Sequence, residues 1–143
     1  MKLTFAPAFP KALQKSIEAT LKPYRPLVET KLDILYVAFD TDANPEDRQA
    51  IAAVLTNREY KQAQLLIFPK FLILDEAEQE ASLVHELTHV LVAPFRDECF
   101  RLIEYYIPEM NTRNYVAEIL SEKEEFIVTE VSAALVDFRR GEA

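Results

Sequence analysis

Residues 75–94 read DEAEQEASLVHELTHVLVAP, and this stretch predicts an amphipathic helix. Asp75 is a suitable N-cap residue, and the glutamates of the first turns suit the positive end of a helix. Apolar residues surround His85 and His89, so we expect this part of the helix to lie at least partly in the core. Pro94 is expected to end the helix, because proline lacks the backbone N–H that continues the hydrogen-bond ladder.

The pentapeptide His85-Glu86-Leu87-Thr88-His89 is an HExxH motif inside this helix. Residues i and i+4 lie one turn apart on the same face, so the two imidazoles can converge on one metal ion. Glu86 lies beside them, where it could take a proton from a water molecule that the ion activates. These are the only two histidines of the chain, and buried imidazoles without a partner would be costly. The alternative is a chance match between two ordinary helix histidines and the motif.

Two histidines do not complete a catalytic zinc site, which usually has three protein ligands and one open position for water. The chain has no further histidine, and its only cysteine, Cys99, lies in an acidic and apolar stretch and is expected to be structural. The third ligand is therefore expected to be a carboxylate. The downstream glutamates on predicted helical segments are Glu118, Glu122, Glu124, Glu125 and Glu130.

The HELTH sequence is identical to the motif helix of thermolysin-like peptidases, and the chain resembles the gluzincin group to which they belong. That group takes its third zinc ligand from a glutamate on a later helix. On this resemblance Glu125 fits best, with Thr129 at i+4 and Ser132 at i+7. Glu124 is the rival, because it lies nearer the middle of an apolar stripe. The resemblance implies Zn²⁺ held by His85, His89 and one of these two glutamates.

The chain is much shorter than a thermolysin-like enzyme and looks more like the compact HExxH domains of phages and prophages, and those of peptidases that cleave phage repressors. The resemblance implies a zincin-like α+β fold: a helix, an antiparallel sheet, the HExxH helix and a later helix that carries the glutamate. It implies a zinc metallopeptidase that hydrolyses a peptide or protein substrate, with Glu86 as the base. We expect the substrate to add as an extra strand to an edge strand over 64–68, and the alternative is an interior strand.

Other parts of the chain predict the surrounding elements. Residues 11–21 predict a helix, and residues 31–39, 51–56 and 64–68 predict a three-stranded antiparallel sheet, with a turn over 40–47. An Ala-rich helix over 48–55 is the alternative. Helices are expected over 95–107, ended by Pro108, and over 115–140 as one or two segments. A stripe at helical spacing in the last segment predicts core residues, namely Ile127, Val131, Ala134, Leu135 and Phe138.

The composition sets limits on the class of protein. The chain has 143 residues and is 50% hydrophobic, which predicts one compact domain over residues 1–143. With 16 basic and 24 acidic residues its net charge is −8, which argues against a nucleic-acid binder. The only glycine is Gly141, so glycine-rich phosphate-binding loops are excluded. No membrane span or signal peptide is expected, and one cysteine suits a reducing compartment, which together predict a cytoplasmic protein. The sequence predicts no oligomeric state.

Two features bear on catalysis in opposite directions. Thermolysin-like enzymes stabilise the oxyanion with a further histidine, which this chain lacks. This absence favours a non-catalytic phage or prophage structural or regulatory protein that retains a zinc site, whereas an intact Glu86 favours a peptidase. An acidic interaction module without metal is a third hypothesis. The candidate substitutes for the oxyanion histidine are Tyr60, Tyr105, Tyr106, Tyr115 and Arg113.

Overall fold

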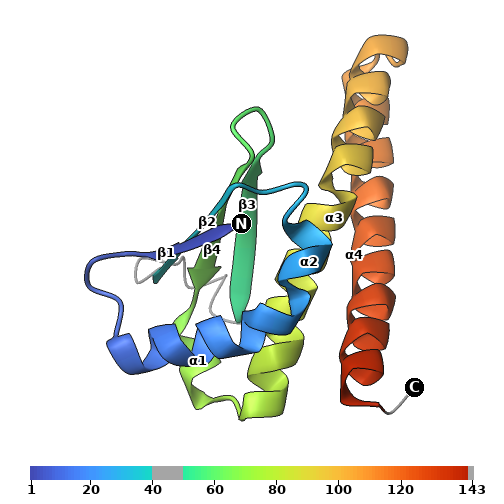
Figure 1. The fold of residues 1–143 in the computed structure, drawn as a ribbon. Helices are drawn as coiled ribbons and strands as arrows, with labels where there is room; N and C mark the ends of the chain where they lie inside the picture. Colours follow the sequence, from blue (N-terminus) through green and yellow to red (C-terminus); the bar gives the residue numbers. More distant parts are fainter. Residues whose placement is uncertain (40–49, 142–143) are drawn as a thin grey trace.

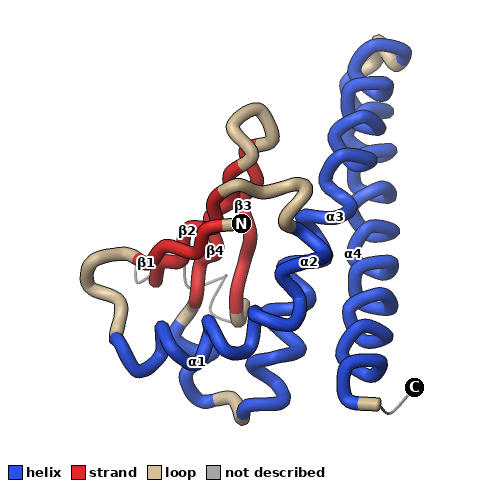
Figure 2. The backbone as a smooth tube through the Cα atoms, viewed as in Figure 1, coloured by secondary structure: helices blue, strands red, loops and turns tan. Residues whose placement is uncertain are grey.

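The structure is a computed structural model that describes residues 1–39 and 50–141. It confirms the α+β class: a four-stranded sheet is covered on one face by helices, and two long helices extend beyond it (Figures 1 and 2). In the sheet the strands are ordered β1-β2-β4-β3. Their bounds are β1 (Lys2–Phe5), β2 (Ile34–Phe39), β3 (Ala52–Asn57) and β4 (Gln62–Ile67).

The sheet is mixed, so the predicted three-stranded antiparallel sheet is wrong. β1 pairs parallel with β2, β2 pairs parallel with β4, and only β3 and β4 form an antiparallel hairpin. The prediction missed β1, a strand of four residues, because parallel partners lie far apart in sequence and leave no turn signal between them. The Ala-rich helix over 48–55 is also wrong for residues 52–55, which lie in β3. The turn expected over 40–47 lies outside the described residues.

Strand β4 lies in the interior of the sheet, between β2 and β3. The predicted edge strand over 64–68 is therefore wrong, and the interior alternative is confirmed. The edge strand that contacts the long helix carrying the HExxH motif is β3 instead. This change matters for function, because an edge strand has free backbone groups that can pair with another chain.

A buried apolar core joins the sheet to the helices that cover it. Helix α1 (Lys11–Leu21) begins and ends where the sequence predicts. It is followed by two short helices, the 3-10 helix η1 (Lys22–Tyr24) and the α-helix α2 (Arg25–Val28). The fully buried side chains at the centre come from α1, α2, the sheet, the turn η3 (Pro69–Ile73) and the long helix after it, and they include Ile17, Leu21, Val28, Leu35, Val37, Leu65, Ile67, Phe71, Leu83 and Val84.

Helix α3 (Glu76–Tyr106) carries the HExxH motif and is 31 residues long. It begins with a capping box: Asp75 accepts a hydrogen bond of 2.8 Å from the Glu78 backbone N–H, and Glu78 accepts one of 3.1 Å from the Asp75 N–H. The predicted stop at Pro94 is wrong, because the helix continues through it to Tyr106. A proline removes one backbone hydrogen bond, and packing along a neighbouring helix compensates for that loss.

Helix α4 (Met110–Arg140) is a single helix that runs back along α3, and it starts before the predicted residue 115 (Figure 1). Its predicted core stripe is wrong for most members, since Ile127, Val131 and Phe138 are 48%, 41% and 79% exposed and Ala134 is also exposed. Only Leu135 packs against the core. The buried face of α4 consists of Val128, Ser132 and Val136. No helix among the described residues is long and apolar enough to cross a membrane.

The end of α4 is tied to the start of α3 by a buried carboxylate, Glu80, which is only 7% exposed. Glu80 accepts hydrogen bonds from Tyr24 at 2.9 Å and from Arg140 at 2.8 Å, and Arg139 lies 3.3 Å away. Burial acts to raise the pKa of Glu80, but the hydrogen bonds from Arg140 and Tyr24 outweigh it and lower the pKa. Burial, with the nearby Glu80, raises the pKa of Tyr24 to about 12. These contacts help to set α4 against α3.

Candidate metal centre

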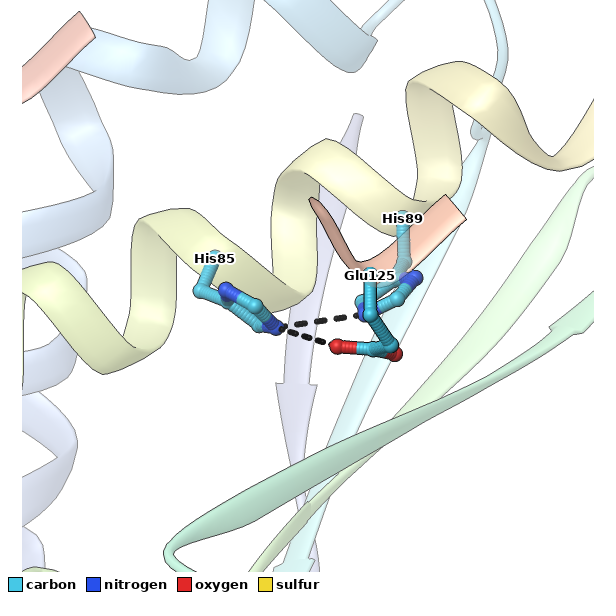
Figure 3. A group of neighbouring side chains, drawn as sticks. All are labelled: His85, His89 and Glu125. Atoms are coloured by element: carbon cyan, nitrogen blue, oxygen red, sulfur yellow. Dashed lines mark hydrogen bonds and ion pairs between the residues drawn. The ribbon is translucent and has the colours of Figure 1, made fainter. Parts of the chain in front are cut away.

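The side chains of His85 and His89 on α3 converge with that of Glu125 on α4 (Figure 3). The two histidine Nε2 atoms are 3.3 Å apart. One oxygen of Glu125 lies 3.1 Å from Nε2 of His89, and the other lies 3.4 Å from Nε2 of His85. These three residues form a group that could hold a metal ion, with one donor atom from each lying within 4.8 Å of the others.

The spacing of these donor atoms can be compared with that around a tetrahedral ion. Bonds of about 2.0–2.1 Å to nitrogen and oxygen place neighbouring ligand atoms ~3.3 Å apart. The two histidine Nε2 atoms are 3.3 Å apart, and they lie 3.1 and 3.4 Å from two different oxygens of Glu125. An ion could therefore bind without a change in the helices. The Glu125 side chain is 60% exposed, whereas that of His89 is 13% exposed, so the group is open to solvent on the glutamate side.

Glu124, the rival candidate for the third ligand, lies on the other side of His89. Its Oε1 is 3.1 Å from Nδ1 of His89, and its side chain is only 10% exposed. A carboxylate can only accept this hydrogen bond, so Nδ1 carries the proton, and Nε2 is the ring nitrogen turned toward Glu125. Glu124 is thus placed to orient His89 rather than to bind the same ion. The other candidate glutamates, Glu118, Glu122 and Glu130, are exposed and lie outside the group.

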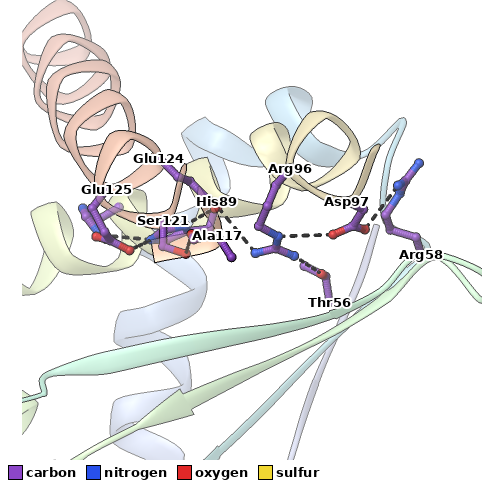
Figure 4. Close-up of polar contacts among 10 residues, drawn as sticks. Thr56, Arg58, His89, Arg96, Asp97, Ala117, Ser121, Glu124 and Glu125 are labelled. Carbon is purple, nitrogen blue, oxygen red and sulfur yellow. Dashed lines mark hydrogen bonds and ion pairs between the residues drawn. The ribbon is translucent and has the colours of Figure 1, made fainter. Parts of the chain in front are cut away.

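Arg96 continues this polar chain away from the histidines (Figure 4). Its Nη1 lies 3.4 Å from Glu124, its Nη2 donates to Thr56 at 3.4 Å, and its Nε donates to Asp97 at 3.2 Å. Asp97 in turn pairs with Arg58 of the β3–β4 hairpin at 3.2 Å. The sequence interpretation missed Arg96 because it ended the helix at Pro94. Its position at i+7 from His89 would have placed it on the same helix face.

Glu86 points toward β3 and accepts a hydrogen bond from the backbone N–H of Val54. Burial raises the pKa of Glu86 to about 7, with the positive charge of His89 opposing the rise and the negative charge of Glu125 adding to it. A carboxyl group with this pKa can give and take protons near neutral pH. Glu86 and His85 line an open cavity of about 420 Å³ together with Ile51, Ala52, Ala81, Ser82, Thr129, Ser132 and Ala133.

The pKa of His85 is lowered, first because burial disfavours the charged imidazole and second because His89 is close. Glu125 opposes the shift but does not cancel it. A lowered pKa favours the neutral imidazole, which is the form that can bind a metal ion.

Strand β3 is an edge strand of the sheet as far as the chain is described, and its outer edge lies beside this cavity. The Phe68 N–H donates to the Ile51 carbonyl, so the backbone groups of Ile51 point toward β4. Along an antiparallel strand, residues whose backbone groups point toward the partner alternate with residues whose backbone groups point away from it. The backbone groups of Ala52, Val54 and Thr56 therefore point away from β4. One of them, the Val54 N–H, already meets Glu86, so the strand edge and the HExxH helix are in direct contact.

None of the predicted oxyanion residues lies at the metal-ligand group. Tyr105 follows His89 by 16 residues, which is about 24 Å along a helix, and Tyr106 lies one residue further. Tyr115 precedes Glu125 by ten residues, or about 15 Å. Tyr60 lies in the β3–β4 turn and is 63% exposed. The guanidinium of Arg113 is used elsewhere, because it donates to the backbone carbonyls of Glu104 and Ile107 at the end of α3.

Cys99 is a free cysteine and is partly buried. It follows His89 by ten residues on the same helix, which separates them by about 15 Å. Cys99 therefore lies outside the metal-ligand group.

A comparison with protein-family models, with curated proteins and with solved structures found no match to this chain.

Proposed function

We propose that the chain is a zinc-dependent peptidase of the compact zincin type, with His85, His89 and Glu125 as zinc ligands and Glu86 as the general base. The observation that carries this proposal is the convergence of three side chains from the HExxH helix and its neighbour. The two imidazole Nε2 atoms are 3.3 Å apart, and each lies 3.1 or 3.4 Å from a carboxylate oxygen of Glu125. An accidental sequence match gives no reason for a carboxylate 36 residues beyond His89 to meet both imidazoles.

The donor set supports zinc among the metals that proteins bind. Two imidazole nitrogens and one carboxylate, without sulfur, are typical of catalytic zinc sites, and the spacing suits tetrahedral geometry. A zinc ion bound here would supply Lewis-acid activation of a water molecule and of a peptide carbonyl. The exposed side of Glu125 leaves room for the exchangeable fourth position.

The remaining roles belong to the protein's own groups. Glu86 would accept a proton from the attacking water and donate it to the leaving amine, for which a pKa near neutrality is well suited. Glu124 would hold His89 in the tautomer that presents Nε2 to the ion, and Arg96 would balance the charge of Glu124.

The substrate in this proposal is a peptide segment in extended conformation. Among the described residues β3 is an edge strand, and its outer edge runs beside Glu86 and His85, so a peptide could pair with the outward backbone groups of Ala52 and Thr56. In this arrangement the substrate pairs with β3, and not with β4 as the sequence predicted. It would hold the scissile bond over the cavity between β3 and the HExxH helix.

The test combines zinc content with hydrolysis of a mixture of unstructured peptides. We expect one zinc per chain in the parent, in Glu86→Gln and in the control Glu76→Gln, which removes an exposed charge from the same helix. Hydrolysis should fall by a factor of about 10² or more only in Glu86→Gln. Activity that survives this change, or that resists a chelator, would contradict the proposed mechanism. Less than roughly one tenth of an equivalent of zinc after reconstitution would contradict the metal site.

A second candidate is a non-catalytic protein, such as a phage or prophage structural or regulatory factor, that keeps the zinc site. It is favoured by the observation that none of the five predicted oxyanion residues lies at the metal-ligand group. The same experiment separates the two candidates. A non-catalytic protein would bind one zinc per chain, and neither the parent nor Glu86→Gln would hydrolyse any peptide.

A further inference from the structure

Helix α4 has a solvent-facing side, here called the outer face, that carries several large apolar residues. Tyr115, Phe126 and Phe138 are 64%, 65% and 79% exposed, and Ile119 and Ile127 are 38% and 48% exposed. In Figure 1 the α4 ribbon stands at the border of the molecule, with α3 and the sheet on one side of it. The outer face includes Tyr115, Ile119, Lys123, Phe126, Ile127, Glu130, Ala134 and Phe138, and the exposed Asp137 lies on the same side near its C-terminal end.

The outer face is continuous along the helix. Its residues recur at intervals of three, four and seven, which keeps them on one side of an α-helix. From Tyr115 to Phe138 it extends about 35 Å. A helix face that exposes this many large apolar side chains is typical of an interaction site. The sequence interpretation assigned part of this stripe to the core, and its exposure leaves that apolar surface without a packing partner within the described chain.

We infer that the outer face binds the same face of a second copy of this chain, with the two α4 helices antiparallel about a two-fold axis between Phe126 and Ile127. A two-fold dimer uses the same patch on both subunits, so the patch has to be complementary to itself. In this register Phe126 faces the partner's Ile127, and Ile119 faces the partner's Ala134. At the ends of the contact, Tyr115 faces the partner's Phe138.

Two charged residues of the outer face, Lys123 and Glu130, favour this arrangement. Lys123 and Glu130 are equally distant from the proposed axis, so Lys123 faces the partner's Glu130 and Glu130 faces the partner's Lys123. The symmetry therefore creates two opposite-charge pairs. A parallel arrangement in register would place like charges opposite each other, which is unfavourable.

The dimer would leave the candidate metal centre accessible. Val128 and Ser132 mark the side of α4 that packs on the rest of the molecule, and Glu124 and Glu125 meet the α3 histidines rather than the outer face. Dimer formation and metal binding are therefore separate properties, and either can be tested when the other fails.

Sedimentation velocity and light scattering on the full chain test the inference. At concentrations on the order of 10⁻⁴ M, the parent is expected to have twice the 16.5 kDa chain mass. Lys123→Glu and Glu130→Lys should each weaken the dimer about tenfold or more, because each places like charges opposite one another at two symmetric positions. The double variant Lys123→Glu/Glu130→Lys reverses both members of each pair and should recover the parent's dimer affinity to within about threefold.

Two further variants complete the test. Ile127→Glu places a charge beside the axis and should give a monomer, with helix content and urea unfolding checked to show that it folds. Glu118→Lys changes an exposed charge away from the outer face and should leave the dimer unchanged. A monomeric parent would overturn the inference. A dimer that tolerates Ile127→Glu, or that is not restored in the double variant, would also overturn it, because the contact would then lie elsewhere.

Discussion

Replacing Glu124 with Gln tests whether this residue orients His89 or has no part in the metal site. The glutamine keeps the size of the side chain but removes the charge that His89 and Arg96 share, at 3.1 and 3.4 Å. Loss of such an orienting partner typically weakens metal binding by about 10- to 100-fold. We therefore expect a loss of about 1.4–2.7 kcal/mol in zinc binding free energy.

The low exposure of the pair supports the upper part of this range. The Glu124 side chain is 10% exposed and that of His89 is 13% exposed, so water cannot readily replace the lost carboxylate. Arg96 keeps its contacts with Asp97 and Thr56, which limits any wider disturbance. Glu125→Gln removes a ligand in the proposed site and should weaken binding more than Glu124→Gln does.

Competition with a chromogenic chelator measures the zinc affinity of each variant. Glu118→Gln is the matched control, since it removes the same charge from an exposed position of α4. We expect affinity to decrease in the order parent, Glu124→Gln, Glu125→Gln, with the control equal to the parent. Binding by Glu124→Gln within about twofold of the parent would refute the orienting role. A larger loss in Glu124→Gln than in Glu125→Gln would show that Glu124 is the ligand.

Three predictions concern stability and are measured by urea unfolding. Asp75→Ala removes the capping box of α3 and should cost about 1 kcal/mol. Pro94→Ala should raise the free energy of unfolding by about 1–3 kcal/mol, and a decrease would show that the helix needs the proline. Because folding lowers the pKa of Glu80, its ionised form stabilises the protein above the ordinary carboxyl pKa, and this contribution disappears as the pH falls below it. Unfolding of Glu80→Gln should therefore depend less on acidic pH than that of the parent.

Local signals in the sequence predicted individual elements well. The helix Lys11–Leu21 was predicted from the spacing of its apolar residues and from the prolines that follow it. The N-cap at Asp75 was predicted because an aspartate side chain can accept a hydrogen bond from the first turn of the helix. Such signals act over a few residues and leave a clear pattern. The convergence of Glu125 with the two histidines was also expected, but from a resemblance to a known family rather than from the residues themselves.

The failures all involve contacts between distant segments. β1 depends on a parallel partner about 30 residues later, and Pro94 is tolerated within a helix that packs along α4. The face of α4 was misassigned because both sides of this helix carry apolar residues. A small polar residue, Ser132, lies on the buried side, whereas Phe138 lies on the exposed side. Hydrophobic periodicity gives the spacing of a face but does not say which of two faces is covered.

X-ray absorption at the zinc edge of the zinc-loaded protein tests the central claim most directly, because it reports the atoms bound to the ion. A site made by His85, His89 and Glu125 predicts four nitrogen or oxygen neighbours at about 2.0–2.1 Å, with the signature of two imidazoles. His89→Ala should remove this signal. A sulfur neighbour at about 2.3 Å, or a spectrum without imidazole, would contradict the proposed metal centre.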